Sequence, residues 1–183
     1  MDAIDLLLGR VSPAQLAEPG PAAAQLEKIL GAAARAPDHG KMQPWRFLVI
    51  EGSARERFGE VMAQSLMRRE PEAPAGKLDA ERKKALRAPL IVVVGAAVRE
   101  NPKVPEVEQI VAAGAACENM LLAAHALGFG GFWRTGPVAY DAEVKRALGF
   151  AEGDTIVGII YLGSIAMPGQ PRSAEIAAVT RRW

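Results

Sequence analysis

The segment ARAPDHGKMQPWRFLVIEG (residues 34–52) joins a helix-forming part of the chain to a strand-forming part. Pro37 ends the helix, because the residue before a proline is pushed out of the helical region. The tripeptide Asp-His-Gly at residues 38–40 favours a turn, and the β-rich run WRFLVIE at residues 45–51 predicts a strand. A change from helix to strand across one elaborate turn indicates a domain in which helices pack on a sheet.

Periodic apolar positions predict further helices on both sides of this segment. Ser53 and Glu56 have the spacing of a capping box at the start of one of them. The longest pattern, residues 105–128, is rich in alanine and glycine, so another backbone could approach it closely and it is expected to be a central helix. The other predicted helices lie at residues 2–9, 21–36, 53–67 and 141–148, with a short polar helix within 69–88.

Two further apolar runs read as buried strands. Residues 89–98 are almost continuously apolar, which is typical of a strand covered on both faces, and residues 154–164 repeat this pattern. The glycine-rich GFGGFWRTG (residues 128–136) lies between the long helix and the last strand. This order of elements predicts one mixed sheet with helices on both faces, in a single domain spanning residues 1–183.

Composition excludes several classes of protein. About half of the 183 residues are apolar and the formal net charge is +1, which indicates a compact domain without a general attraction to nucleic acid or anionic membrane. The single cysteine, Cys117, excludes an internal disulfide, and only His39 and His125 accompany it, so no structural zinc cluster is expected. The acidic N-terminus and the lack of a long apolar run predict a cytoplasmic protein with no membrane span.

Common short motifs are missing from the sequence. GFGGFW has a tryptophan at the third glycine position of a dinucleotide fingerprint and follows a helix, and neither a P-loop nor a nucleophile elbow occurs. Cys117 is predicted to be a small buried hydrophobe and His125 a packed helix residue. The basic run ERKKALR (residues 81–87) is expected to be a solvated face, as is the C-terminal pair Arg181 and Arg182.

Two pairs of residues point to anion chemistry. Arg10 and Ser12 place a guanidinium beside a small hydroxyl after the first helix, a combination suited to phosphate, although a surface arginine and a helix cap ahead of Pro13 would have the same sequence. Arg35 and His39 flank Pro37, and a helix C-terminus followed by a turn would also explain them.

The order of these features resembles the nitroreductase family of flavoproteins. The resemblance rests on RVS (residues 10–12), the segment 34–52, the run APLIVVV, the long helix, GFGGFWRTG and the closing IVGIIYLG. It implies an α+β sandwich with a mixed, mainly antiparallel sheet flanked by helices, a long central helix and terminal segments swapped between subunits. It also implies a homodimer with one FMN per subunit at each of two sites in the subunit interface.

The resemblance also implies which residues bind cofactors. The phosphate of FMN would be held by the R-x-S element, where Val11 stands in place of a second arginine that Arg181 or Arg182 could replace. Arg35 and His39 would reach the flavin of the other subunit, and GFGGFWRTG would run along the isoalloxazine. The implied FMN-binding residues are Arg10, Val11, Ser12, Arg35, His39, Trp133, Arg134 and Thr135, and an NADP-associated stretch comprises Ala123, Ala124, His125, Ala126, Leu127 and Gly128.

The implied activity is hydride transfer from NAD(P)H through flavin N5 to an electron-poor acceptor such as a nitroaromatic or a quinone. Flavin carries the hydride, so the protein needs no side-chain nucleophile. The protein instead orients the flavin and supplies a hydrogen-bond donor near N5 and positive charge near the N1 and O2 edge. Arg35 or Arg134 is a candidate for that charge. Two alternatives stay open from the residues alone: a flavin-binding protein without NAD(P)H turnover (a sensor, a flavin store or a flavin-modifying enzyme), and a non-enzymatic interaction module.

Overall fold

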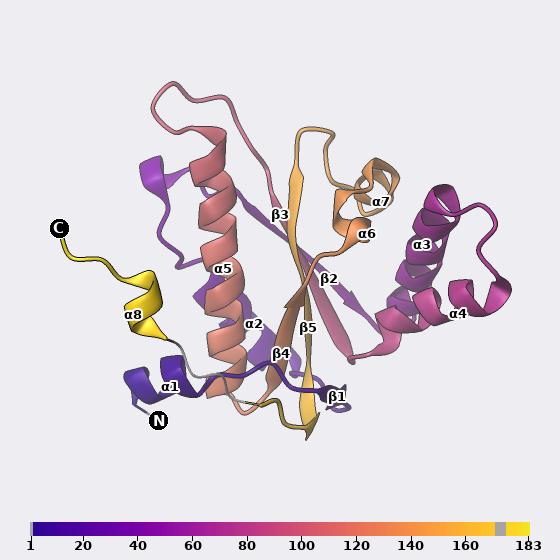
Figure 1. The fold of residues 1–183 in the computed structure, drawn as a ribbon, viewed down its shortest axis with the longest axis horizontal. Helices are drawn as coiled ribbons and strands as arrows, with labels where there is room; N and C mark the ends of the chain where they lie inside the picture. Colours follow the sequence, from indigo (N-terminus) through magenta and orange to yellow (C-terminus); the bar gives the residue numbers. More distant parts are fainter. Residues whose placement is uncertain (1, 171–174) are drawn as a thin grey trace.

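The computed structural model describes residues 2–170 and 175–183, and its centre is a five-stranded sheet (Figure 1). The long last strand β5 pairs with three others, and the order along the main path is β1-β5-β3-β2, with β4 also on β5. Every strand pairing within the described residues is antiparallel, which confirms the mainly antiparallel sheet that the resemblance implies; the parallel pairs of a mixed sheet do not occur among them. The strands are β1 (Gln15–Ala17), β2 (Trp45–Glu51), β3 (Leu90–Ala96), β4 (Gly130–Arg134) and β5 (Thr155–Met167).

Helices cover both faces of the sheet, as the sequence predicts. On one face, α2 and α5 pack on alternate side chains of β3 such as Val92 and Val94. On the other, α3 and the short helices after β4 pack against Ile91 and Val93, and α4 lies on α3. The helices are α1 (Ala3–Gly9), α2 (Ala23–Ala33), α3 (Ala54–Arg69), α4 (Ala75–Lys83), α5 (Glu106–Ala126), α6 (Pro137–Tyr140), α7 (Ala142–Ala147) and α8 (Ile176–Val179), with 3₁₀ turns η1 (His39–Lys41) and η2 (Lys84–Leu86).

The main elements lie close to their predicted positions. Strand β2 has the predicted bounds, all seven residues of β3 are buried, and the long helix α5 runs for 21 residues. Asp2 caps α1 by accepting a hydrogen bond from the Ile4 amide, and Asp141 caps α7 in the same way. Local sequence therefore specifies most of this fold.

Three local predictions were wrong. The expected capping box at Ser53 does not form, because the Ser53 side chain makes no cap hydrogen bond. The prolines and glycine of residues 10–21 predict a loop there, yet residues 15–17 form β1 against an extension of β5 as far as Met167. The sequence predicts an irregular tail after Ser164, yet this part of the chain contains the rest of β5 and the short helix α8.

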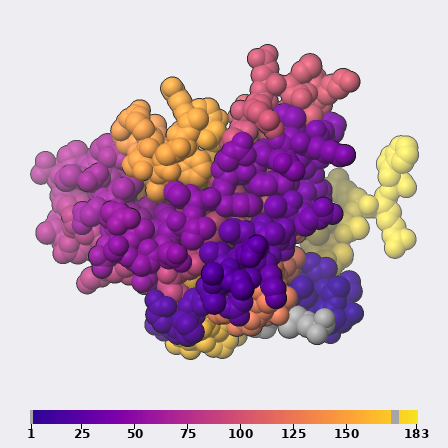
Figure 2. Space-filling model, turned by 180° about the vertical axis from the view of Figure 1, so that it is seen from behind, coloured from indigo at the N-terminus to yellow at the C-terminus, as the bar shows by residue number. Residues whose placement is uncertain are grey.

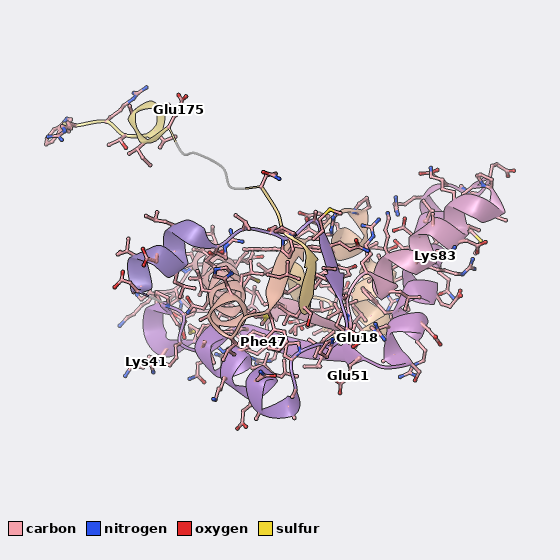
Figure 3. All side chains as sticks on the ribbon, turned by 90° about the horizontal axis from the view of Figure 1, so that it is seen from below. Glu18, Lys41, Phe47, Glu51, Lys83 and Glu175 are labelled. Atoms are coloured by element: carbon pink, nitrogen blue, oxygen red, sulfur yellow. The ribbon has the colours of Figure 1, made fainter. Side chains whose placement is uncertain are left out.

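The C-terminal residues 175–183 are all exposed and stand off the body of the molecule in all three views (Figures 1–3). Figure 3 labels Glu175 at the start of this segment, well away from the sheet. Within the described residues, no helix is both long and apolar enough to cross a membrane, and no group of three metal-ligating side chains gathers.

Candidate functional site

Arg10, just after α1, has a guanidinium only partly satisfied by the protein. Its Nε lies 3.4 Å from Oε1 of Glu118 on α5, and the arginine side chain is 24% exposed. Its Nη1 atom is buried and has no hydrogen-bond partner among residues 2–170 and 175–183. A buried N–H group without an acceptor costs free energy, so the structure leaves a position where an anion would be stabilised.

The chain after Arg10 crosses to the other face of the sheet. Ser12 is exposed, and the backbone of the outgoing C-terminal segment passes so close that a Cβ on Gly169 would lie 2.0 Å from the Ser12 carbonyl oxygen. The Ala14 amide donates to the Met167 carbonyl at 3.0 Å. The R-x-S element is therefore fixed at the side of the sheet where β1 and the end of β5 meet.

A groove continues from this element along β4. It consists of two neighbouring cavities of about 360 and 340 Å³, which share Arg87 and Arg134 in their walls. The first cavity begins at Ala14, two residues after Ser12. The remaining lining residues are Gln15, Leu16, Leu86 and Phe132 in the first cavity, and Met62, Glu81, Lys84, Trp133, Thr135, Gly136, Pro137, Val138, Ile159 and Tyr161 in the second.

Positive charge dominates the wall of this groove. The guanidinium carbon of Arg134 lies 4.8 Å from the centre of the Phe132 ring, a cation–π arrangement that orients it. Lys84 Nζ contacts Glu81 Oε2 at 2.6 Å, and Glu81 is buried. With Arg87 nearby, three cations face one carboxylate, which suits a ligand carrying negative charge or carbonyl oxygens.

Tyr161 forms the floor of the second cavity. Its ring stacks on Phe132 with centroids 5.2 Å apart. Burial raises the pKa of Tyr161 to about 12, although the charges of Arg87 and Arg134 oppose the shift. The phenol therefore stays protonated at neutral pH.

Trp133 lies on the opposite face of β4, towards α5. Its indole N–H donates to the Val157 carbonyl at 3.0 Å, and the ring is 38% exposed. A Cβ on Gly158 would lie 2.6 Å from the indole nitrogen, so glycine is needed there for the tryptophan to lie against β5. Cys117 is fully buried as predicted, and burial raises the pKa of its thiol to about 12, which makes it unreactive at neutral pH.

The predicted site residues fall into three places in this single chain. Trp133, Arg134 and Thr135 line the groove, whereas Arg10, Val11 and Ser12 come just before its first residue, Ala14, and do not line it. Arg35 and His39 are exposed, and His39 lies against α5 at a different cavity. Residues 123–128 lie at the C-terminal end of α5, where Ala124 is fully buried in the core.

Sequence reasoning missed Glu81, Lys84 and Arg87. The run that contains them was expected to be a solvated face; instead Glu81 is buried, and all three line the second cavity. The closely spaced charges of this run do not indicate which side chain is buried. The packing of α4 on α3 decides which of them turns inward. The apolar Ala85 inside the run and Ala88 directly after it, both buried, were the available hint that one side faces the core.

Comparison with known proteins identifies the family. The family model described as "Nitroreductase family" matches residues 14–164. The chain belongs to the nitroreductase family. This match spans the groove and the sheet except for the last three residues of β5, and it begins two residues after the R-x-S element ends.

Relatives within this family match over most of their length. The chain is 48% identical over 164 residues to "Putative NAD(P)H nitroreductase YdjA" of Escherichia coli (strain K12), covering 90% of this chain and 88% of that protein. It is 35% identical over 165 residues to a "Putative NAD(P)H nitroreductase" of Haemophilus influenzae, covering 90% and 89%. A nitroreductase-like family protein from Bacillus cereus has the same fold, with a TM-score of 0.85, 24% identity and coverage of 100% and 96%.

Proposed function

We propose that this protein is an FMN-dependent oxidoreductase. It takes hydride from NAD(P)H through flavin N5 and passes it to an electron-poor acceptor such as a nitroaromatic or a quinone. Support comes from the relatives named as NAD(P)H nitroreductases and from fold neighbours, among them a Desulfovibrio desulfuricans protein whose structure is described as a complex with FMN (TM-score 0.76).

The observation that carries the proposal is the buried Nη1 of Arg10, which has no hydrogen-bond partner among the described residues and lies four residues before Ala14, where the cationic groove begins. FMN has a phosphate at one end and a ring with carbonyl oxygens at the other. Arg10 and Ser12 fit the phosphate, because a guanidinium and a hydroxyl both donate to its oxygens. The groove that starts at Ala14 and ends at Thr135 fits the rest of the molecule.

Residues at the inner end of the groove have distinct roles in this proposal. FMN, when bound, supplies the hydride chemistry at N5. Arg134, with Lys84 and Arg87, provides positive charge for the carbonyl edge of the ring, where negative charge develops on reduction. Backbone N–H groups of residues 133–135 are the candidate donors near N5.

We further propose a homodimer with FMN at each of two sites in its interface, in the cytoplasm. Arg35 and His39 are exposed in the single chain and would contact the flavin of the other subunit. The exposed segment 175–183 would pack on the partner as a swapped terminus, and either Arg181 or Arg182 would supply the charge that Val11 lacks. The stretch Ala123–Gly128 stays a proposal for contact with NADP.

The experiment that tests the function starts with the purified protein. FMN should be released on denaturation and identified by mass spectrometry, and NADH or NADPH should bleach the 450 nm flavin band in an anaerobic stopped flow. A protein that binds FMN but is bleached by neither nucleotide would be a flavin-binding protein without turnover. A protein that binds no FMN even after incubation with it would refute the proposal.

A further inference from the structure

The turn that carries His39 is held firmly against the start of α5. Asp38 Oδ2 accepts from the Gln43 amide at 2.6 Å, and Arg99 donates to the Met42 carbonyl. Lys41 and Gln43 have positive φ angles of 53° and 46°, a conformation that costs free energy for residues with a side chain. Strain of this kind persists where the surrounding contacts fix it, so the position of His39 is determined by the fold.

His39 makes one directed contact. Its Nδ1 contacts Oε2 of Glu108 in the first turn of α5. A carboxylate at Nδ1 keeps the proton on that nitrogen and fixes the orientation of the ring, as it does in other carboxylate–histidine pairs. The second ring nitrogen, Nε2, is then the atom available to a substrate.

The pair lies at the wall of a cavity of about 410 Å³ between the turn and α5. This volume is within the range of small-molecule sites. The other walls are mainly apolar, and they are formed by Pro37, Asp38, Val107, Val111, Ala112 and Ala115. An apolar slot with one polar pair in its wall suits a flat ring that carries an oxygen at its edge.

We propose that this cavity binds the ring of an aromatic or quinoid acceptor and that His39, oriented by Glu108, protonates the oxygen of the acceptor. The inference rests on the proposed function, in which His39 of one subunit lies beside the flavin of the other. It adds a substrate subsite and a proton donor, His39, with Glu108 as its positioning residue.

The proton balance of the reaction shows why such a donor is useful. A quinone receives hydride, which is two electrons and one proton, at one of its oxygens from the reduced flavin, and the flavin is thereby oxidised. The electron pair of the second C=O bond moves to the second oxygen, which takes the Nε2 proton of the imidazolium. The histidine is left neutral with its remaining proton on Nδ1, facing Glu108, and it regains the Nε2 proton from water.

The test separates proton transfer from electron transfer. Holoenzyme is reduced with one equivalent of dithionite, which bypasses NAD(P)H, and is mixed in a stopped flow with either a benzoquinone or ferricyanide, a one-electron acceptor that takes no proton. We expect His39→Gln to slow oxidation by the quinone at least about tenfold, within the usual effect of a general acid. Oxidation by ferricyanide should change less than about twofold.

Two further variants sharpen the test. Glu108→Gln should slow the quinone reaction by a smaller factor, and Lys103→Gln, an exposed neighbour that does not line the cavity, should leave both acceptors unchanged. Equal slowing of both acceptors by His39→Gln would mean that His39 only positions the flavin, and no slowing would mean that solvent supplies the proton; either result overturns the inference while the proposed function stands. Loss of FMN or of quinone reactivity in the parent protein would overturn both.

A structural readout accompanies the kinetics. The chain has only two histidines, so ¹⁵N-histidine NMR of the holoenzyme gives two sets of signals, and His39→Gln assigns them. We expect neutral His39 to carry its proton on Nδ1, and we expect Glu108→Gln to shift the proton towards Nε2. A His39 protonated on Nε2 in the parent protein would show that Glu108 does not orient the ring.

Discussion

Arg10 divides its guanidinium between Glu118, which contacts Nε, and a buried space beside Nη1. The ion pair with a half-exposed carboxylate contributes little stability on its own. It does, however, restrict the side chain to one orientation before any ligand binds. Glu118 therefore acts as a positioning contact for the proposed phosphate site.

Arg10→Ala should weaken FMN binding by about 1.5–3 kcal/mol, the usual range for a hydrogen bond to a charged group. The dissociation constant is measured from the quenching of FMN fluorescence, and circular dichroism checks that the variant is folded. Arg57→Ala, an exposed arginine on α3, is the matched control and should leave the affinity unchanged. An unaltered affinity in a folded Arg10 variant would assign Arg10 a purely structural role.

The ionised side chain of Asp141 stabilises the folded protein. Burial raises the pKa of Asp141, but hydrogen bonds from the Arg68 guanidinium and the Glu143 amide outweigh it and lower the pKa to about 2, against 3.8 for an ordinary aspartate. A lowered pKa means that the folded state favours the ionised form. Its contribution to stability is therefore present above about pH 4 and is lost as the pH falls towards 2.

Asp141→Asn should consequently destabilise the protein by about 1–2 kcal/mol at neutral pH, because asparagine keeps the helix cap but loses the charge that pairs with Arg68. Urea unfolding measures the difference at pH 7 and again near pH 2.5, where it should shrink. Asp79→Asn removes a more exposed carboxylate that also pairs with an arginine, and it should show neither the cost nor the pH dependence.

At the scale of elements, β4 and α5 meet through small residues. Trp133 fits between them because Gly158 on β5 and Gly114 on α5 leave room for its ring. A methyl group at Gly158 would lie 2.6 Å from the indole nitrogen and 3.1 Å from the Cys117 sulfur. Cys117 is fully buried, and the Trp133 indole is tied to the Val157 carbonyl by a hydrogen bond, so relieving the collision would require that bond to break.

Gly158→Ala should destabilise the protein by about 1–3 kcal/mol, the usual cost of overpacking, and should displace the Trp133 ring from its place between β5 and α5. Thermal unfolding gives the stability, and a change in tryptophan emission reports the displacement. Gly153→Ala is the control, since a Cβ there meets no atom within 4 Å. Equal melting temperatures for the two variants would show that the tryptophan moves aside without cost.

Elements with a strong local pattern could be predicted from the sequence, and elements that depend on distant contacts could not. Strand β2, strand β3 and helix α5 carry continuous apolar or helical periodicity over seven or more residues. Strand β1 has three residues, and it exists only because β5 extends far enough to pair with it. Sequence alone has no signal for a pairing between segments so far apart.

In the candidate site, too, residues in short motifs could be predicted from the sequence, and residues brought in by distant contacts could not. Residues 133–135 could be picked out from the order of short motifs, and the structure sets them in the wall of the groove. The R-x-S element ends two residues before the groove begins at Ala14, and its role in binding phosphate stays a prediction. Glu81, Lys84 and Arg87 could not be found, because they sit in a charged run whose inward side is decided by the packing of α4 on α3. The contact between His39 and Glu108 joins residues 69 positions apart, so it too required the fold.

At the scale of the whole molecule, large apolar side chains remain exposed on the side of α5. Val107 and Val111 on that helix are 63% and 64% exposed. Ile4 and Leu8 on α1, which packs on α5, are also exposed. Isolated exposed apolar residues are ordinary, but several that gather on neighbouring helices indicate a protein interface. A second copy of the chain is the partner that the proposed flavin site requires, since Arg35 and His39 are outside the groove of their own subunit.

The dimer is therefore expected to be required for cofactor binding. The double variant Val107→Glu/Val111→Glu places two carboxylates in the proposed interface and should convert the dimer to a monomer, as measured by light scattering after size exclusion. Because each flavin site would lose its contribution from the partner, FMN affinity should fall at least about tenfold, equivalent to the loss of one or more interactions of 1.4 kcal/mol. Met67→Glu on α3, an exposed apolar residue beyond the opposite face of the sheet, should leave the protein dimeric and fully loaded. A folded monomer that binds FMN as tightly as the parent would show that each chain holds its flavin alone, and the exposure of Arg35 and His39 would then need another explanation.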